Sequence, residues 1–160
     1  MPESTDRVST DRVTTDPVTL LSRALDLTGA IIAGVRVDQQ HLPTPCRSWD
    51  VTDLSAHLVH DLAQFSERAS GGTPDWSGPR AAVEGDYIDA YRAGAATLVQ
   101  AWRAAGDLSG TVEMPGMGEV PKRFPLDQQI AEFAVHGWDL AVATGQSTLL
   151  DPEVGDTALT

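Results

Sequence analysis

The chain contains 160 residues, of which 23 are acidic and 11 basic, giving a formal net charge of −12. This charge repels phosphate backbones and anionic lipid headgroups, so neither nucleic acid nor a membrane surface is an expected partner. No apolar run approaches the roughly 18 residues of a membrane span, and the first residues lack the basic and apolar blocks of a signal peptide. Because Cys46 is the only cysteine, an internal disulfide is excluded. We therefore expect a reduced, cytoplasmic protein.

The N-terminus carries a short internal repeat. A five-residue unit occurs at residues 4–8 and 9–13, with a degraded copy at 14–18. One valine per unit cannot bury a core, and polar tracts at a chain end are more often disordered tails than partner-binding arms. We predict a disordered tail over residues 1–16 and a single domain over residues 17–160.

Two amphipathic helices are predicted in the first half of this domain, because apolar residues recur there at intervals of three and four. The first begins at Asp16-Pro17, where aspartate can cap the free amides, and its apolar stripe runs from Leu20 to Val35. Two prolines then enforce a loop over residues 41–50. The second helix is predicted over residues 51–69.

Two further long helices are predicted in the second half. A loop rich in glycine and proline precedes an alanine-rich helix over residues 81–105. Residues 111–124 suit an irregular loop or a short hairpin. The next helix runs from Phe124 to a glycine stop at Gly145, and Asp151-Pro152 predicts a last, short helix that must dock to be stable. Four long helices with little strand signal predict an all-α, four-helix bundle.

Two of the predicted helices carry candidate metal ligands. Glu132 and His136 stand four residues apart, which places both side chains over one face of the fourth long helix. His57 lies beside Leu54 and Leu58 of the second helix, so it points toward the interior. Two imidazoles and one carboxylate leave a fourth coordination position open, as in catalytic zinc sites. The sequence therefore predicts a divalent-metal site, for which iron, nickel and manganese are alternatives to zinc.

Spacing alone also allows a simpler interpretation, in which Glu132 and His136 form a helix-surface pair and His57 is a core histidine bonded to a carbonyl.

Three neighbours could support the ligands. His60 and Asp61 follow His57 by three and four residues, and either could be an alternative ligand or a hydrogen-bond partner. Asp139 follows His136 by three residues and could accept a hydrogen bond from a ring nitrogen.

Two other residues near these segments have structural interpretations. Cys46 could be a fourth metal ligand or a nucleophile, but it is expected to be a buried structural residue, because free cysteines usually behave as small apolar side chains. Trp49 is expected to pack the loop down just before the helix cap.

Two segments, taken together, resemble a known family. They are TPCRSWDVTDLSAHL at residues 44–58 and EFAVHGWDL at residues 132–140. They resemble the actinobacterial metal-binding proteins of the mycothiol-dependent maleylpyruvate isomerase type, which belong to the DinB-like four-helix superfamily. The resemblance implies that His57, Glu132 and His136 bind zinc, since these positions match the histidine of the family's D-L-x-x-H segment and both ligands of its E-x-x-x-H segment.

The resemblance also implies mycothiol as a thiol cofactor. A divalent ion with one carboxylate ligand leaves a net positive centre, which would bind the cofactor sulfur and hold it as thiolate. We therefore expect a zinc-dependent thiol transferase or isomerase whose partners are a small-molecule thiol and an electrophilic substrate. The net charge of −12 disfavours a dianionic substrate.

Two other functions remain open at this point. One is a metal-dependent hydrolase that uses metal-bound water, although no motif supplies an obvious general base. The other is a non-catalytic, metal-binding helical interaction module. Relatives of this type commonly continue past the position of Thr160, so the resemblance supports metal binding more directly than catalysis. A homodimer is compatible with the sequence.

Overall fold

The computed structural model describes residues 15–80, 83 and 86–160. The predicted disorder of the N-terminal repeat falls mainly on residues 1–14 and lies outside the described residues. The division into a tail over 1–16 and one domain over 17–160 stays a prediction. The described chain contains a 3₁₀ turn at Val37–Gln39 and the following elements: α1 (Pro17–Ala33), α2 (Val51–Ala69), α3 (Tyr87–Ala105), β1 (Thr111–Met114), β2 (Gly118–Pro121), α4 (Phe124–Thr144) and α5 (Pro152–Ala158).

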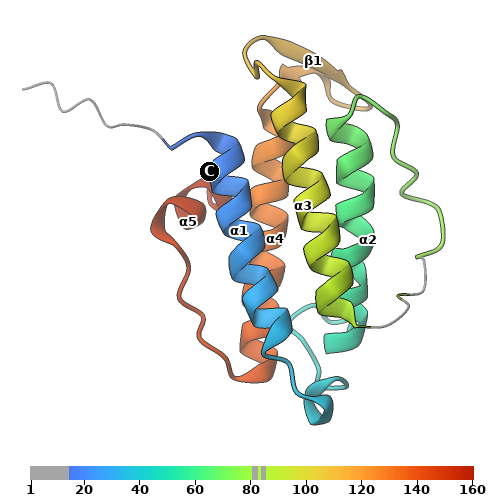
Figure 1. Cartoon of the computed structure of the whole chain (residues 1–160), viewed down its shortest axis with the longest axis vertical. Helices are drawn as coiled ribbons and strands as arrows, with labels where there is room; N and C mark the ends of the chain where they lie inside the picture. The colour runs from blue at the N-terminus through green and yellow to red at the C-terminus, as the bar shows by residue number, and fades with distance from the viewer. Residues whose placement is uncertain (1–14, 81–82, 84–85) are drawn as a thin grey trace, which may run out of the picture.

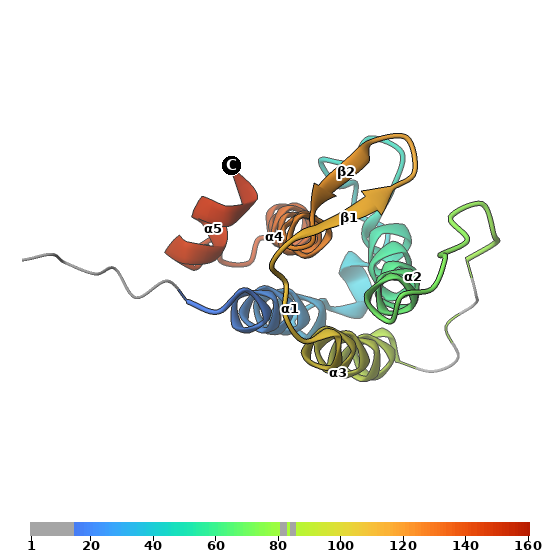
Figure 2. The same ribbon diagram turned by 90° about the horizontal axis from the view of Figure 1, so that it is seen from above.

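The four long helices form a bundle, which confirms the predicted all-α, DinB-like architecture (Figure 1). Seen from above, α1 lies between α3 and α4 (Figure 2). Like α1, α2 contacts both α3 and α4. The core lies between the four helices, and leucine is its most frequent residue. None of the described helices is long and apolar enough to cross a membrane.

The helix starts follow from capping. Asp16 accepts a hydrogen bond from the Thr19 amide at the start of α1, as expected from the sequence. For α3 the predicted start at residue 81 is wrong, because the described residue Asp86 has extended dihedrals and its carboxylate accepts a hydrogen bond from the Ile88 amide. This cap makes Tyr87 the first helical residue.

The segment between α3 and α4 forms a hairpin, one of the two predicted alternatives. β1 and β2 pair antiparallel, with Val112 opposite Val120, at one end of the bundle (Figure 1). Gly116 and Gly118 have φ values of 79° and 74°, a region of backbone conformation that favours glycine at a tight turn. The connection between α1 and α2 lies at the opposite end.

The short α5 docks as predicted, against α1 and α4. Val154 is fully buried in this contact. Arg23 of α1 forms ion pairs with Asp151 and Glu153 at the start of α5. Seven residues are too few for a helix that is stable alone, so these tertiary contacts hold α5 in place.

α1 and α4 approach each other closely at Gly137. The Thr28 hydroxyl donates a hydrogen bond to the backbone carbonyl of Phe133, with an oxygen–oxygen distance of 2.8 Å. A Cβ atom added to Gly137 would lie 2.5 Å from Thr28 Oγ1. The absence of a side chain at Gly137 therefore sets the position of the part of α4 that carries His136.

Candidate metal centre

Local capping at the start of α2 positions His57. The Asp50 carboxylate accepts from the Asp53 amide at 2.8 Å, and the Asp53 carboxylate accepts from the Asp50 amide at 3.3 Å. This reciprocal capping box sets the first turn. His57 then lies beside the fully buried Leu54 and Leu58, and only 14% of its side chain is exposed. The apolar stripe thus turns His57 toward α4.

α4 presents Glu132 and His136 to His57. The Nε2 atoms of His57 and His136 each lie 3.0 Å from the same oxygen, Glu132 Oε1. The two imidazole rings meet edge-on, with centroids 5.1 Å apart. One nitrogen from each histidine and one Glu132 oxygen all lie within 4.8 Å of one another. The structure thus brings together the three predicted ligand residues from two facing helices.

The charges of this cluster favour a cation between the side chains. Burial by itself would raise the pKa of Glu132, but hydrogen bonds from His136 and His57 outweigh it and lower that pKa to about 2. Burial disfavours the charged form of His136, but Glu132 and then Asp139 raise its pKa above the ordinary value. The carboxylates therefore stabilise positive charge at the imidazoles.

Asp139 and Cys46 support His136 from the other side of its ring. Asp139 Oδ2 lies 3.1 Å from His136 Nδ1, an interaction that orients the ring and leaves Nε2 facing Glu132. The Cys46 thiol donates to Asp139 at 3.3 Å, and its sulfur lies 3.6 Å from His136 Nδ1. Burial, together with Asp139, raises the pKa of Cys46 to about 11, so this thiol stays protonated near neutral pH.

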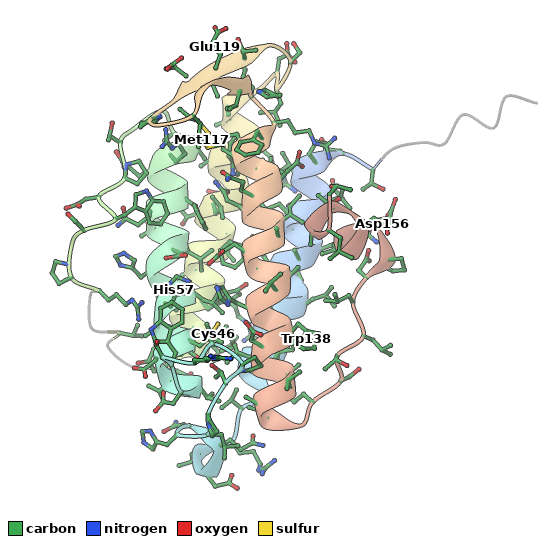
Figure 3. The ribbon with its side chains drawn as sticks, turned by 180° about the vertical axis from the view of Figure 1, so that it is seen from behind. Cys46, His57, Met117, Glu119, Trp138 and Asp156 are labelled. Carbon is green, nitrogen blue, oxygen red and sulfur yellow. The ribbon has the colours of Figure 1, made fainter. Side chains whose placement is uncertain are left out.

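The expectation for Cys46 is therefore corrected. It is half-buried instead of fully buried, and it contacts the cluster instead of the apolar core. Figure 3 shows Cys46 and His57 on the side of the bundle formed by α2 and α4. The loop that carries Cys46 brings it there, because a bridge pairs Pro43 with Asp50 and the Thr44 hydroxyl donates to the Trp49 carbonyl at 2.7 Å.

The two other predicted neighbours differ in position. Asp61 is buried, and its Oδ2 lies 3.2 Å from His57 Nε2. Burial raises the pKa of Asp61 to about 6, although His57 acts in the opposite direction. His60, in contrast, has no hydrogen bond or ion pair to the cluster among the described residues. The structure thus places Asp61 in contact with His57 but outside the group of three candidate ligands, and among the described residues His60 makes no such contact.

Trp49 and Arg80 form one wall of the site, and sequence reasoning missed both roles. The Trp49 ring lies 4.4 Å from the His57 ring, measured between centroids. The Arg80 guanidinium carbon lies 4.6 Å from the centre of the Trp49 ring. Trp49 was expected only to pack the loop. No local pattern indicated that residues 49, 57 and 80 would stack, because these contacts depend on loop paths.

The fold and the cluster together define a four-helix bundle with a candidate divalent-metal centre between two facing helices. The chain belongs to the family of the mycothiol maleylpyruvate isomerase N-terminal domain, whose family model matches residues 21–141. This finding confirms the resemblance seen in the two sequence segments.

The chain is also similar to two uncharacterized proteins from two strains of Mycobacterium tuberculosis. Each is 39% identical over 132 residues, an alignment that covers 82% of this chain and 69% of the relative. No solved structure matches the chain significantly. The family is thus established, whereas these relatives bring no named activity.

Proposed function

We propose that the protein binds a divalent metal ion, zinc foremost, through His57, Glu132 and His136. One observation carries this proposal: two imidazole nitrogens from different helices lie 3.0 Å from the same carboxylate oxygen. Imidazole nitrogen and carboxylate oxygen are common zinc ligands, and three protein ligands leave a position open for another molecule. The residues present therefore fit a metal ion.

We further propose that the protein is a cytoplasmic, mycothiol-dependent transferase or isomerase that acts on a small electrophile. When bound, the ion would supply a positive charge that favours the thiolate form of a sulfur cofactor. Asp139 would hold the His136 ring in the orientation that keeps Nε2 available. Trp49 would shield His57 from water on one side. The family description supports mycothiol as the thiol.

Arg80 suggests which electrophiles fit the site. Its guanidinium lies over the Trp49 ring, close enough for its charge to act on Asp61. In a protein with a net charge of −12, this cation would locally offset the repulsion of an anionic group. An electrophile with one carboxylate is therefore our preferred substrate class.

The test combines metal analysis with binding measurements on the purified chain. We expect about one equivalent of Zn²⁺ per chain by calorimetric titration of chelator-treated protein. His57→Ala and His136→Ala should each abolish stoichiometric binding. His60→Ala is the matched control, since it removes a histidine from the same helix without touching the cluster. Absence of zinc binding by the wild-type protein would refute the metal site.

A second measurement separates the candidate activities. Mycothiol should raise the melting temperature of the zinc-loaded protein and leave the metal-free protein unchanged, because a ligand stabilises only the state that binds it. Stoichiometric zinc with no response to mycothiol would refute the thiol-dependent activity. It would favour a hydrolase or a non-catalytic metal-binding module.

A further inference from the structure

A cavity of about 280 Å³ lies between α1, α4 and residues 145–151, the segment that leads from α4 to α5. This segment runs back along the bundle from the end of α4 to α5 (Figure 1). Small, buried residues of α1 and α4 form the floor of the cavity: Ala24, Ala134, Gly137 and Ala141. Because these residues are small, the two helices leave a hollow between themselves and the segment outside them.

The cavity lies on the face of α4 opposite the candidate metal centre. At 100° per residue, the lining residues Ala134, Trp138 and Ala141 lie about 140–160° around the helix from His136. Figure 3 shows Trp138 on the side of α4 that faces the segment leading to α5, away from His57. None of the three candidate metal ligands lines the cavity. The cavity is therefore separate from the site of the proposed metal chemistry.

The lining of the cavity offers water few hydrogen-bond partners. The Thr28 hydroxyl already donates to the Phe133 carbonyl. The Gln146 side-chain amide donates to the Ile31 carbonyl at 2.9 Å. The remaining polar side chains of the lining are grouped at residues 147–148, just beyond the end of α4. About nine water molecules would fill the volume at roughly 30 Å³ each, and most would lack partners. An apolar ligand that displaces such water gains affinity.

The rim of the cavity carries exposed apolar side chains. Leu27, Trp138 and Leu150 are 37–42% exposed and Leu149 is 87% exposed, and all four line the cavity. Clustered exposed apolar residues often mark a binding site. No acidic or basic side chain lines the cavity in the described part of the chain. In a protein with a net charge of −12, an anionic ligand would find no compensating cation here.

We propose that this cavity binds a small, uncharged aliphatic ligand. Its chain would lie against the floor residues, and a neutral polar end such as a hydroxyl would face residues 146–148. The volume of 280 Å³ lies at the lower end of small-molecule sites, which usually measure about 300–1,000 Å³. A partner helix, with a diameter of about 10–12 Å, would be too wide to enter. A medium-chain alcohol has the required chemistry.

A second copy of the chain is the alternative occupant of the rim. Val135 and Val142 are exposed on α4 and continue the apolar surface of Trp138 at helical spacing. Two copies that packed these surfaces together would cover the opening of the cavity. The ligand and the second copy therefore exclude each other, and the oligomeric state distinguishes them.

The experiment titrates the full-length protein with octanol in a calorimeter, with octanoate as the charged analogue of the same chain length. Ala134→Leu fills the floor of the cavity. Trp138→Ala removes part of the exposed rim and serves if the filled variant does not fold. Val135→Ala is the matched control, because it shortens an exposed apolar side chain of α4 outside the lining. Analytical ultracentrifugation measures the oligomeric state of each protein.

We expect a monomer that binds one octanol per chain, with affinity rising about fourfold per methylene from butanol to octanol. Octanoate should bind at least about tenfold more weakly, because its charge would be buried without a partner. Ala134→Leu and Trp138→Ala should each lower octanol affinity by about tenfold or more. Val135→Ala and His57→Ala should bind octanol as the wild-type protein does.

Three results would overturn the ligand site. They are a wild-type protein that does not bind octanol, a dimer that excludes octanol from its interface, and octanoate that binds as tightly as octanol. Loss of octanol binding in His57→Ala would also overturn it, because the alcohol would then occupy the metal centre. None of these results bears on zinc binding by His57, Glu132 and His136, so the ligand site and the proposed function fail independently.

Discussion

The contact between Gly137 and Thr28 allows a quantitative prediction for the substitution Gly137→Ala. At an exposed helical position this change stabilises a helix by about 1 kcal/mol, because alanine has the higher helix propensity. At Gly137 the new methyl group would lie 2.5 Å from Thr28 Oγ1, 3.3 Å from its Cβ and 3.4 Å from its Cγ2. The first distance is impossible without movement of Thr28 or of one helix.

Both kinds of movement cost free energy. Rotation of Thr28 would break its buried hydrogen bond to the Phe133 carbonyl, which contributes about 0.5–1.5 kcal/mol. Separation of α1 and α4 would strain a packed core, at a typical cost of about 1–3 kcal/mol. If both movements occur they cost about 1.5–4.5 kcal/mol together, so after subtraction of the gain in helix propensity we expect a net destabilisation of about 0.5–3.5 kcal/mol, with a melting temperature lower by roughly 1–14 °C.

Urea denaturation followed by circular dichroism measures this effect. Gly155→Ala is the matched control, because its added Cβ would meet no atom closer than Leu150 Cβ at 3.9 Å. Its stability should be unchanged or slightly higher. In a Thr28→Ala background, which removes the hydroxyl, Gly137→Ala should cost less than in the wild-type protein. A Gly137→Ala protein as stable as wild type, or additive effects in the double mutant, would refute the steric argument.

Two further predictions concern the support of His136 and the docking of α5. Asp139→Ala should weaken zinc binding by about 10- to 100-fold in a calorimetric titration, because His136 Nδ1 loses its acceptor; equal affinity would show that Asp139 does not orient the ring. At α5, burial by itself would raise the pKa of Asp151, but the hydrogen bond from Arg23 outweighs burial, so that pKa is lowered. The ion pair therefore stabilises the folded protein above the unfolded pKa of about 3.9, and this contribution is lost as the pH falls through the lower, folded value. Hydrogen-exchange protection of α5 amides should be higher at pH 6 than at pH 3 in the wild-type protein and low at both pH values in Arg23→Gln. Equal protection of the wild-type protein at the two pH values would contradict this role.

The sequence predicted most of the helices because their signals are local. The Asp50 cap and the leucines that follow define α2, and its predicted range, residues 51–69, is the observed one. α4 likewise starts at Phe124 and ends before Gly145, as predicted. The start of α3 was placed too early, because an alanine-rich segment has high helix propensity even where Asp86 provides the cap.

The candidate centre was predictable in part. Because Glu132 and His136 are four residues apart on a helix, their proximity follows from helix geometry. Their proximity to His57 depends on how α2 and α4 are rotated about their own axes, and apolar stripes define that rotation only approximately. For these three residues the sequence prediction therefore relied on the resemblance of two segments to a known family.

The sequence by itself determined the helices, their buried faces and the family to which the chain belongs. Only the tertiary structure decided which polar side chains share the site. Cys46 and Trp49 reach it through the path of a loop, and Asp61 differs from His60 because a step of one residue turns a helical side chain by about 100°. Such a step turns a side chain away from the site, and residue spacing alone does not show which of two neighbouring residues faces it.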